Sequence, residues 1–270
     1  MTEYHNQPAP DPSAPGRWRD LTARVLSSLV LVPLALGALV LGGPFWGALV
    51  LLATAAVAWE GASLLGQNMK DAGTWGFVGC VVLGVLLAEV HHPFWGLVIA
   101  CCSMVYGRKL LSAAIVAFLG AGSLALLREM PQGLVMVLFV LAVVVAADTG
   151  AYVTGRLVGG PKLAPAISPG KTVSGAVGGW VAAMVAGVLV ARFSGTAHGF
   201  LPALWALVLA VASQMGDLAE SAFKRRVGVK DSGRLIPGHG GALDRFDGLL
   251  AAAPLALLIA AFTGRFPFWL

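Results

Sequence analysis

Charged side chains gather in one segment of an otherwise apolar sequence. Residues 221–247 read SAFKRRVGVKDSGRLIPGHGGALDRFD and hold six of the 18 basic and three of the 13 acidic residues of the chain. Asp244 and Asp247 are three residues apart, and Asp217 and Glu220 have the same spacing just before the segment. Residues at i and i+3 share a helix face. The spacing therefore predicts two pairs of carboxylates, each on one face of a helix.

Clustered carboxylates repel one another unless a cation lies among them. Asp217, Asp244 and Asp247 offer only oxygen atoms, and such ligand sets suit Mg²⁺, which commonly bridges carboxylates and substrate phosphates. We predict these three as Mg²⁺ ligands, with Asp148 as a further candidate member of the cluster. The number of acids leaves room for a second cation. A site with Mg²⁺ beside bound phosphate is suited to phosphoryl or nucleotidyl transfer at a membrane surface.

Basic side chains in the same segment are candidates for holding phosphate, because lysine and arginine form charge-assisted hydrogen bonds to its oxygens. They are the lysines and arginines that surround the carboxylates in residues 221–247. The alternative is a basic loop that only sets membrane topology, with the acids as counter-ions. That alternative does not account for acids at both flanking helices.

His239 lies within the run Gly-His-Gly-Gly. It is either a turn residue or a group that presents its imidazole, or neighbouring backbone N–H groups, to a phosphate. The residues alone do not separate these two interpretations.

A second polar segment, residues 146–175, reads AADTGAYVTGRLVGGPKLAPAISPGKTVSG. Asp148 directly follows an apolar run, where carboxylates are costly and usually functional; the alternative is a helix-end carboxylate solvated by headgroup water. Glycines allow backbone N–H groups to approach a phosphate, and Arg156 and Lys171 add positive charge. The alternative for the segment as a whole is a membrane-protein loop whose polar residues only confer solubility.

The tripeptide Gly-Lys-Thr at 170–172 does not form a P-loop, because Pro165 occupies the position where that motif requires glycine. Lys171 and Thr172 instead begin the next predicted helix. The N–H groups and dipole of a helix N-terminus favour a bound anion. We therefore predict an anion site there.

The elements that must position these residues are membrane helices. Of 270 residues, 58% are hydrophobic and 11% are charged, against about 25% charged residues in an average soluble domain. A bilayer core needs about 20 apolar residues per helix. The fold class predicted is an all-α integral membrane protein, a polytopic bundle of about nine transmembrane helices with no soluble domain. The predicted spans are 22–41, 45–65, 75–90, 93–107, 110–127, 133–148, 173–193, 200–217 and 248–263.

Positive charges give the orientation, because lysine and arginine are retained on the cytoplasmic side. With a cytoplasmic N-terminus, 15 of the 18 basic residues fall inside. This predicts a disordered cytoplasmic tail over 1–18, N-terminal membrane helices over 19–132, and a C-terminal catalytic region over 133–270 with cytoplasmic loops at 149–172 and 218–247. The net charge of +5 is explained by topology and does not indicate nucleic acid. We expect a multi-pass protein of a bacterial cytoplasmic membrane with its active site facing the cytoplasm.

At this point a family resemblance is evident. The charged segment resembles the signature of the CDP-diacylglycerol synthase, or phosphatidate cytidylyltransferase, family. The fixed positions are Ser221, Phe223, Lys224, Arg225, Lys230, Asp231, Gly233, Ile236, Pro237, His239, Gly240, Gly241, Asp244, Arg245, Phe246 and Asp247. The stretches 148–156 and 167–172, and the Gly216-Asp217 and Glu220-Ser221 pairs, are also similar to that family. Ala242 departs from it, since the family usually has a larger aliphatic residue there.

The resemblance implies a reaction of CTP with phosphatidic acid in the bilayer that gives CDP-diacylglycerol and pyrophosphate. It implies an in-line attack by the lipid phosphate on the α-phosphorus, with Mg²⁺ held by the three aspartates. Catalytic residues would be Asp217, Lys224, Arg225, Lys230, Asp231, His239, Asp244, Arg245 and Asp247. Substrate-binding residues would be Asp148, Arg156, Ser168, Lys171, Thr172, Ser221, Gly240 and Gly241. A homodimer is suspected for a bundle of this kind.

Two other functions use similar residues. A CTP-dependent polyprenol or phytol kinase would transfer the terminal phosphoryl group, so that the released product, CDP rather than pyrophosphate, separates it from the synthase. An anion transporter would place charges in the middle of its helices. Here nearly all charges lie at predicted helix ends, and only Glu60 is deep, where a hydrogen bond to a neighbouring helix would explain it.

Overall fold

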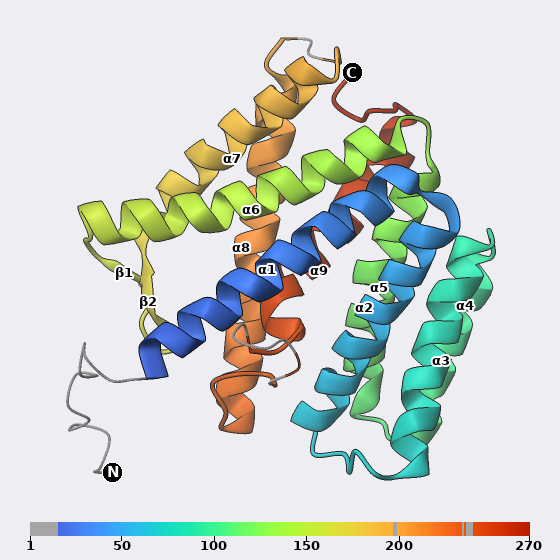
Figure 1. Cartoon of the computed structure of the whole chain (residues 1–270). Coiled ribbons are helices and arrows are strands. Elements are labelled where there is room, and N and C mark those ends of the chain that lie inside the picture. Colours follow the sequence, from blue (N-terminus) through green and yellow to red (C-terminus); the bar gives the residue numbers. More distant parts are fainter. Residues whose placement is uncertain (1–15, 197–198, 234, 236–239) are drawn as a thin grey trace.

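The computed structural model describes residues 16–196, 199–233, 235 and 240–270, with only the backbone of residues 16–25. The predicted tail, apart from its last three residues, and His239 therefore lie outside the described residues. The described part is a helical bundle with one small hairpin (Figure 1). Its helices are α1 Gly16–Leu41, α2 Gly43–Leu64, α3 Ala72–Glu89, α4 Pro93–Cys102, the 3₁₀ turn η1 Ser103–Tyr106, α5 Leu110–Glu129, α6 Gly133–Val158, α7 Val173–Phe193, α8 Leu201–Val227 and α9 Leu243–Thr263.

Helix length and composition confirm the all-α membrane fold. Within the described ranges, seven helices are long and apolar enough to cross a bilayer, namely α2, α3 and α5 to α9. The apolar part of α1, residues 26–41, and the α4–η1 segment are shorter. Each of the nine predicted spans coincides with a helix, and the proposal that all nine cross the membrane stays a prediction.

Two of the predicted loops are partly helical. α6 continues ten residues beyond the predicted end at Asp148, and α8 continues ten residues beyond Asp217. The glycines of α6 allow close packing against the next segment. A Cβ at Gly150 would lie 2.5 Å from Cβ of Ala182, and a Cβ at Gly155 would lie 2.9 Å from Oγ1 of Thr172. Small residues serve this purpose in membrane helix pairs, so Asp148 lies within a helix and not at its end.

A β-hairpin connects α6 to α7. Strand β1, Lys162–Ala164, pairs antiparallel with β2, Ser168–Thr172, with Lys162 opposite Thr172 and Ala164 opposite Ser168. β2 leads directly into α7, whose N-cap residue is Thr172. The hairpin therefore fixes the direction in which residues just before α7 point.

The larger buried cluster connects the C-terminal helices to the N-terminal ones, and a second cluster lies mainly between α2, α3 and α5. α6 packs along α7, and α8 packs against both α7 and α9. Phe139 of α6 stacks on Trp269, with ring centroids 4.1 Å apart, and the Trp269 indole donates a hydrogen bond of 3.1 Å to Thr196. The last residues of the chain thus fold back and close the end of the bundle that is remote from the hairpin (Figure 1).

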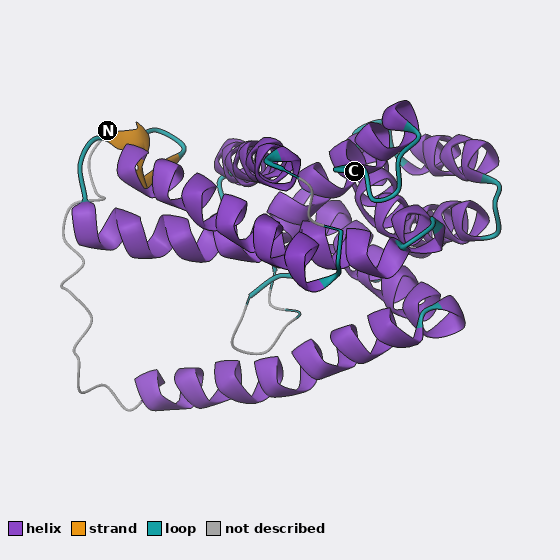
Figure 2. Cartoon of the chain, turned by 90° about the horizontal axis from the view of Figure 1, so that it is seen from above, coloured by secondary structure: helices purple, strands orange, loops and turns teal. Residues whose placement is uncertain are grey.

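α1 is set apart from this core. Figure 2 shows it as the long helix that follows the grey N-terminal trace, on one side of the other helices, and its main packing partner is α2. At the turn between α1 and α2, Nε of Arg128 donates a hydrogen bond of 2.9 Å to the carbonyl of Leu39. α1 is therefore attached near its C-terminal end.

Candidate active site

A polar cavity of about 600 Å³ lies between α6, the hairpin, α7 and α8. It collects side chains that are up to 69 positions apart in the sequence, from Asp148 to Asp217. Five of the predicted site residues line it: Asp148, Arg156, Lys171, Thr172 and Asp217. Asp217, four residues before the first polar segment, therefore lines the same cavity as residues of the second polar segment.

An ion pair joins α8 to the second polar segment across this cavity. Nζ of Lys171 lies 2.5 Å from Oδ2 of Asp217, and each side chain is about a quarter exposed. Thr172 holds the start of α7, because its Oγ1 accepts a hydrogen bond of 3.1 Å from the N–H of Gly175. The predicted helix N-terminus is thus present, with a lysine immediately before it.

Two carboxylates, Asp148 and Asp217, line this cavity, and Asp247 lines a second cavity. Asp247 of α9 interacts electrostatically with Asp217 and Asp148, and Asp148 interacts with Asp217 and Lys171. One oxygen of Asp247 accepts a hydrogen bond of 2.6 Å from the N–H of Gly248. α6, α8 and α9 each contribute one acid to this group.

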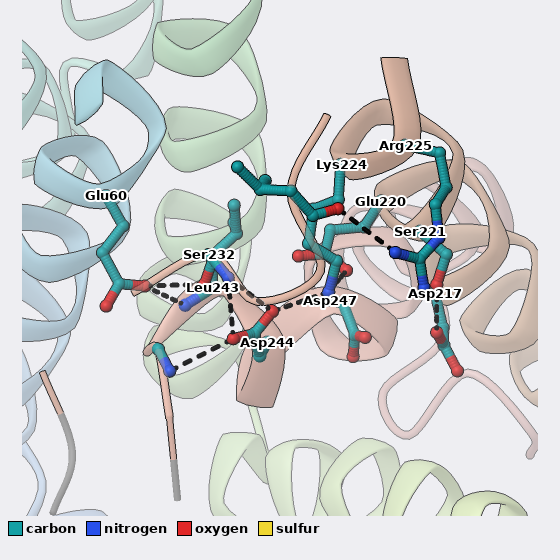
Figure 3. Close-up of polar contacts among 12 residues, drawn as sticks. Glu60, Asp217, Glu220, Ser221, Lys224, Arg225, Ser232, Leu243, Asp244 and Asp247 are labelled. Atoms are coloured by element: carbon teal, nitrogen blue, oxygen red, sulfur yellow. Dashed lines mark hydrogen bonds and ion pairs between the residues drawn. The ribbon is translucent and has the colours of Figure 1, made fainter. Parts of the chain in front are cut away.

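A second charged group lies deeper between α8 and α9 (Figure 3). Nζ of Lys224 is 2.7 Å from Glu220 and 2.6 Å from Asp244, and all three side chains are about one-tenth exposed. The ammonium of Lys224 thus faces two carboxylates, and this residue does not line the polar cavity. Lys224 thus belongs to an internal ion triad with Glu220 and Asp244, and its contact with phosphate stays a prediction.

Asp244 organises the backbone around the start of α9. Its carboxylate accepts hydrogen bonds from the N–H of Ser232, at 3.0 Å, and from the N–H of Gly241, at 3.1 Å, besides the ion pair to Lys224. Both oxygens therefore have partners within the protein. Among the residues that the structure describes, no group of three acidic, histidine or cysteine side chains is placed to hold a metal ion. In this structure Asp244 is held by the backbone and by Lys224, and the Mg²⁺ triad of Asp217, Asp244 and Asp247 stays a prediction.

Glu60 of α2 supports the same backbone from the other side, and its bond to the N–H of Leu243 in α9 agrees with the expected hydrogen bond to a neighbouring helix. It is 3% exposed, and its Oε2 accepts hydrogen bonds from the N–H of Leu243, at 2.8 Å, and from the hydroxyl of Ser232, at 3.1 Å. A Cβ at Gly233 would lie 2.5 Å from Oε1 of Glu60, so only glycine fits there without rearrangement. A carboxylate deep in an apolar helix was the available signal. Figure 3 shows Glu60 and Asp244 on either side of Ser232.

The other predicted residues lie farther from the polar cavity. Oγ of Ser221 donates a long hydrogen bond of 3.4 Å to Asp217. Arg225 binds the carbonyl of Ile167 at 3.4 Å and so connects α8 to the hairpin. Lys230, Asp231 and Arg245 are exposed, Ser168 and Gly240 are half-buried and Gly241 is buried.

Comparisons with known proteins show the family to which the chain belongs. Residues 22–263 match the cytidylyltransferase family. A phosphatidate cytidylyltransferase of Brucella suis is 39% identical over 253 residues, which cover 90% of this chain and 94% of that protein. A phosphatidate cytidylyltransferase of Staphylococcus saprophyticus is 46% identical over 145 residues, which cover 52% of this chain and 54% of that protein. The chain belongs to the cytidylyltransferase family, as the resemblance predicted, and is a membrane-embedded nucleotidyltransferase.

Proposed function

We propose that the protein transfers the cytidylyl group of CTP to phosphatidic acid and releases pyrophosphate. The observation that carries the proposal is the ion pair between Lys171 and Asp217, which joins the second polar segment to α8 across one cavity at the start of α7. The relatives named above carry the corresponding activity in their names. A membrane-embedded bundle gives such a site direct access to a lipid substrate.

The side chains of the polar cavity suit a triphosphate. Lys171 and the N-terminus of α7 present positive charge at one wall, and Arg156 of α6 presents it at another. Arg156 is held by a hydrogen bond of 2.8 Å from its Nη1 to the hydroxyl of Tyr152. The attacking phosphate of phosphatidic acid is already nucleophilic, so the protein has only to align it with the α-phosphorus and stabilise the negative charge on pyrophosphate.

Mg²⁺ remains part of the proposal. It commonly uses one or two carboxylates together with substrate phosphates, and Asp217 and Asp247, with Asp148 nearby, provide such a set. Asp244 does not fit, because both of its oxygens already have partners. Bound Mg²⁺ would neutralise charge on the triphosphate and on the leaving pyrophosphate. A second cation and a homodimer stay predictions.

The cytoplasmic orientation is likewise proposed. Lys70 follows α2, Arg108 and Lys109 precede α5, and residues 224–226 lie near the end of α8. In Figure 1 these three helix ends lie at the lower side of the bundle. Basic residues concentrated at one side support a cytoplasmic site.

The test of this function is pyrophosphate release by purified protein in detergent. We expect release that requires CTP, phosphatidic acid and Mg²⁺ together, and that stops when EDTA is added. Replacing phosphatidic acid with phosphatidylcholine serves as the control, because it lacks the terminal phosphate. Release of CDP in place of pyrophosphate would favour the kinase alternative.

Two matched substitutions test whether Asp247 binds Mg²⁺ while Asp244 holds the backbone and Lys224. Asp247→Asn should raise the Mg²⁺ concentration needed for half-maximal activity by about tenfold, because one metal-facing charge is lost. Asp244→Asn should lower the turnover while leaving that Mg²⁺ concentration within about twofold of the wild type, because Asp244 holds backbone and Lys224. A shift of the Mg²⁺ requirement in Asp244→Asn and none in Asp247→Asn would reverse this assignment.

A further inference from the structure

An apolar groove lies on the side of α9 that faces away from the polar cavity. It has a volume of about 440 Å³ and is lined mainly by α1, α2, α5 and α9. Among the described residues that line it, Arg245 is the one charged side chain, and nearly all the others are aliphatic or aromatic. The catalytic proposal does not use this groove.

The groove has a cationic end and an apolar end. Leu243, two residues before Arg245, binds Glu60 at 2.8 Å, so the first turn of α9 lies beside the C-terminal part of α2. At the other end Trp46, near the start of α2, donates a hydrogen bond of 3.3 Å to the carbonyl of Leu124. Eleven residues separate Trp46 from Val57, which gives the groove a length of about 16 Å along α2. One positive charge at one end of a long apolar groove matches a lipid that has an anionic headgroup and a long acyl chain.

The groove opens sideways. α1 forms its outer wall with Leu31 and Leu34, which are 44% and 57% exposed. α1 is set apart from the rest of the bundle (Figure 2). A lipid can therefore enter from the bilayer between α1 and the remaining helices.

The groove is also continuous with the catalytic side of α9. Val57 and Leu250 line it and at the same time line a second cavity of about 360 Å³, which reaches Glu220 and Asp247. Arg245 and Asp247 are two residues apart at the start of the same helix. A phosphate held at Arg245 would therefore lie about 3 Å along the helix axis from the level of Asp247, which lines the second cavity.

We propose that this groove binds one acyl chain of the anionic lipid substrate, with the lipid phosphate at the Arg245 end. The inference rests on the proposed function, because that function supplies the phosphatidic acid. Charge decides against a neutral bilayer lipid as the specific occupant, since the cationic end of the groove complements a phosphomonoester.

Adjacent positions of α2 provide a matched pair of variants. Ala53 lines the groove, whereas Leu52 is 70% exposed and lies outside its lining. Ala53→Phe fills the groove, and Leu52→Phe adds similar bulk on the outer surface. If the new ring displaces two methylenes of a bound chain, Ala53→Phe should lower kcat/KM for dipalmitoyl phosphatidic acid about tenfold. Activity with dihexanoyl phosphatidic acid should stay within about twofold for both variants, because its chains do not reach that depth.

A loss that is equal for the long and the short lipid, or no loss with either, would overturn the inference. A second readout is independent of turnover: phosphatidic acid with a diazirine in one chain should label groove residues of α1 or α2, and unlabelled phosphatidic acid should displace it. Displacement by phosphatidylcholine to the same extent would identify a bilayer lipid as the occupant and contradict the proposal. If wild-type protein makes no CDP-lipid but is labelled specifically, the proposed function is refuted and the lipid-binding role of the groove is retained.

Discussion

Glu60→Ala is expected to lower the turnover about 100-fold, although Glu60 lies outside the polar cavity. The change leaves the N–H of Leu243 and the hydroxyl of Ser232 without their acceptor in a buried position. Each unsatisfied buried donor costs about 1–3 kcal/mol. The start of α9, which carries Asp244 and Asp247, would shift as a result. The measurement is kcat and KM for CTP in detergent, with the melting temperature as a check of folding.

Glu60→Gln is the informative companion, because its amide oxygen can still accept both hydrogen bonds. It should recover activity to within about tenfold of the wild type. Glu129→Ala, at an exposed glutamate of α5, is the matched control and should behave as the wild type. Equal losses in Glu60→Gln and Glu60→Ala would show that the negative charge itself acts, and that capping of α9 is not the role of Glu60.

Lys224→Met is expected to have the largest effect on stability. The ammonium lies between Glu220 and Asp244 with all three side chains mostly buried, so its removal leaves two carboxylates without their counter-ion. Removing one partner of a buried ion pair typically costs about 3–5 kcal/mol. We therefore expect a melting temperature lower by several degrees or more, together with loss of activity. Arg226→Met, an exposed basic residue two positions away, should leave both unchanged.

A double variant separates stability from chemistry in this triad. Lys224→Met combined with Glu220→Gln removes one of the two unpaired charges and should recover part of the lost melting temperature. Activity should not return, because Asp244 still lacks the partner that fixes its position. Full activity in the double variant would contradict the positioning role of Lys224 and Asp244.

The sequence predicted the helices well, because each needs an apolar run long enough to cross a bilayer, and that signal survives without tertiary information. It also predicted that Lys171 and Asp217 belong to one site, since both adjoin polar segments. It did not predict where α6 ends. Gly150 and Gly155 indicate a loop by intrinsic preference, whereas in the bundle they permit close contact with α7 and its N-cap.

The partners of individual carboxylates were harder to predict. Asp244 and Asp247 have the spacing of a ligand pair, yet Asp244 is taken by Lys224 and by two backbone N–H groups. Spacing along a helix gives the face of a side chain but not the groups that other segments bring to it. Glu60 shows the same limit, because its partners are 172 and 183 positions away in the sequence.

The fate of the CTP phosphates tests the central claim most directly. Purified protein is incubated with phosphatidic acid and Mg²⁺, and with CTP that carries ³²P at either the α- or the γ-position in parallel reactions. The account predicts that α-label enters the lipid fraction while γ-label appears in pyrophosphate, in equal amounts. Transfer of γ-label to the lipid, with α-label remaining in CDP, would contradict cytidylyl transfer and identify the protein as a kinase.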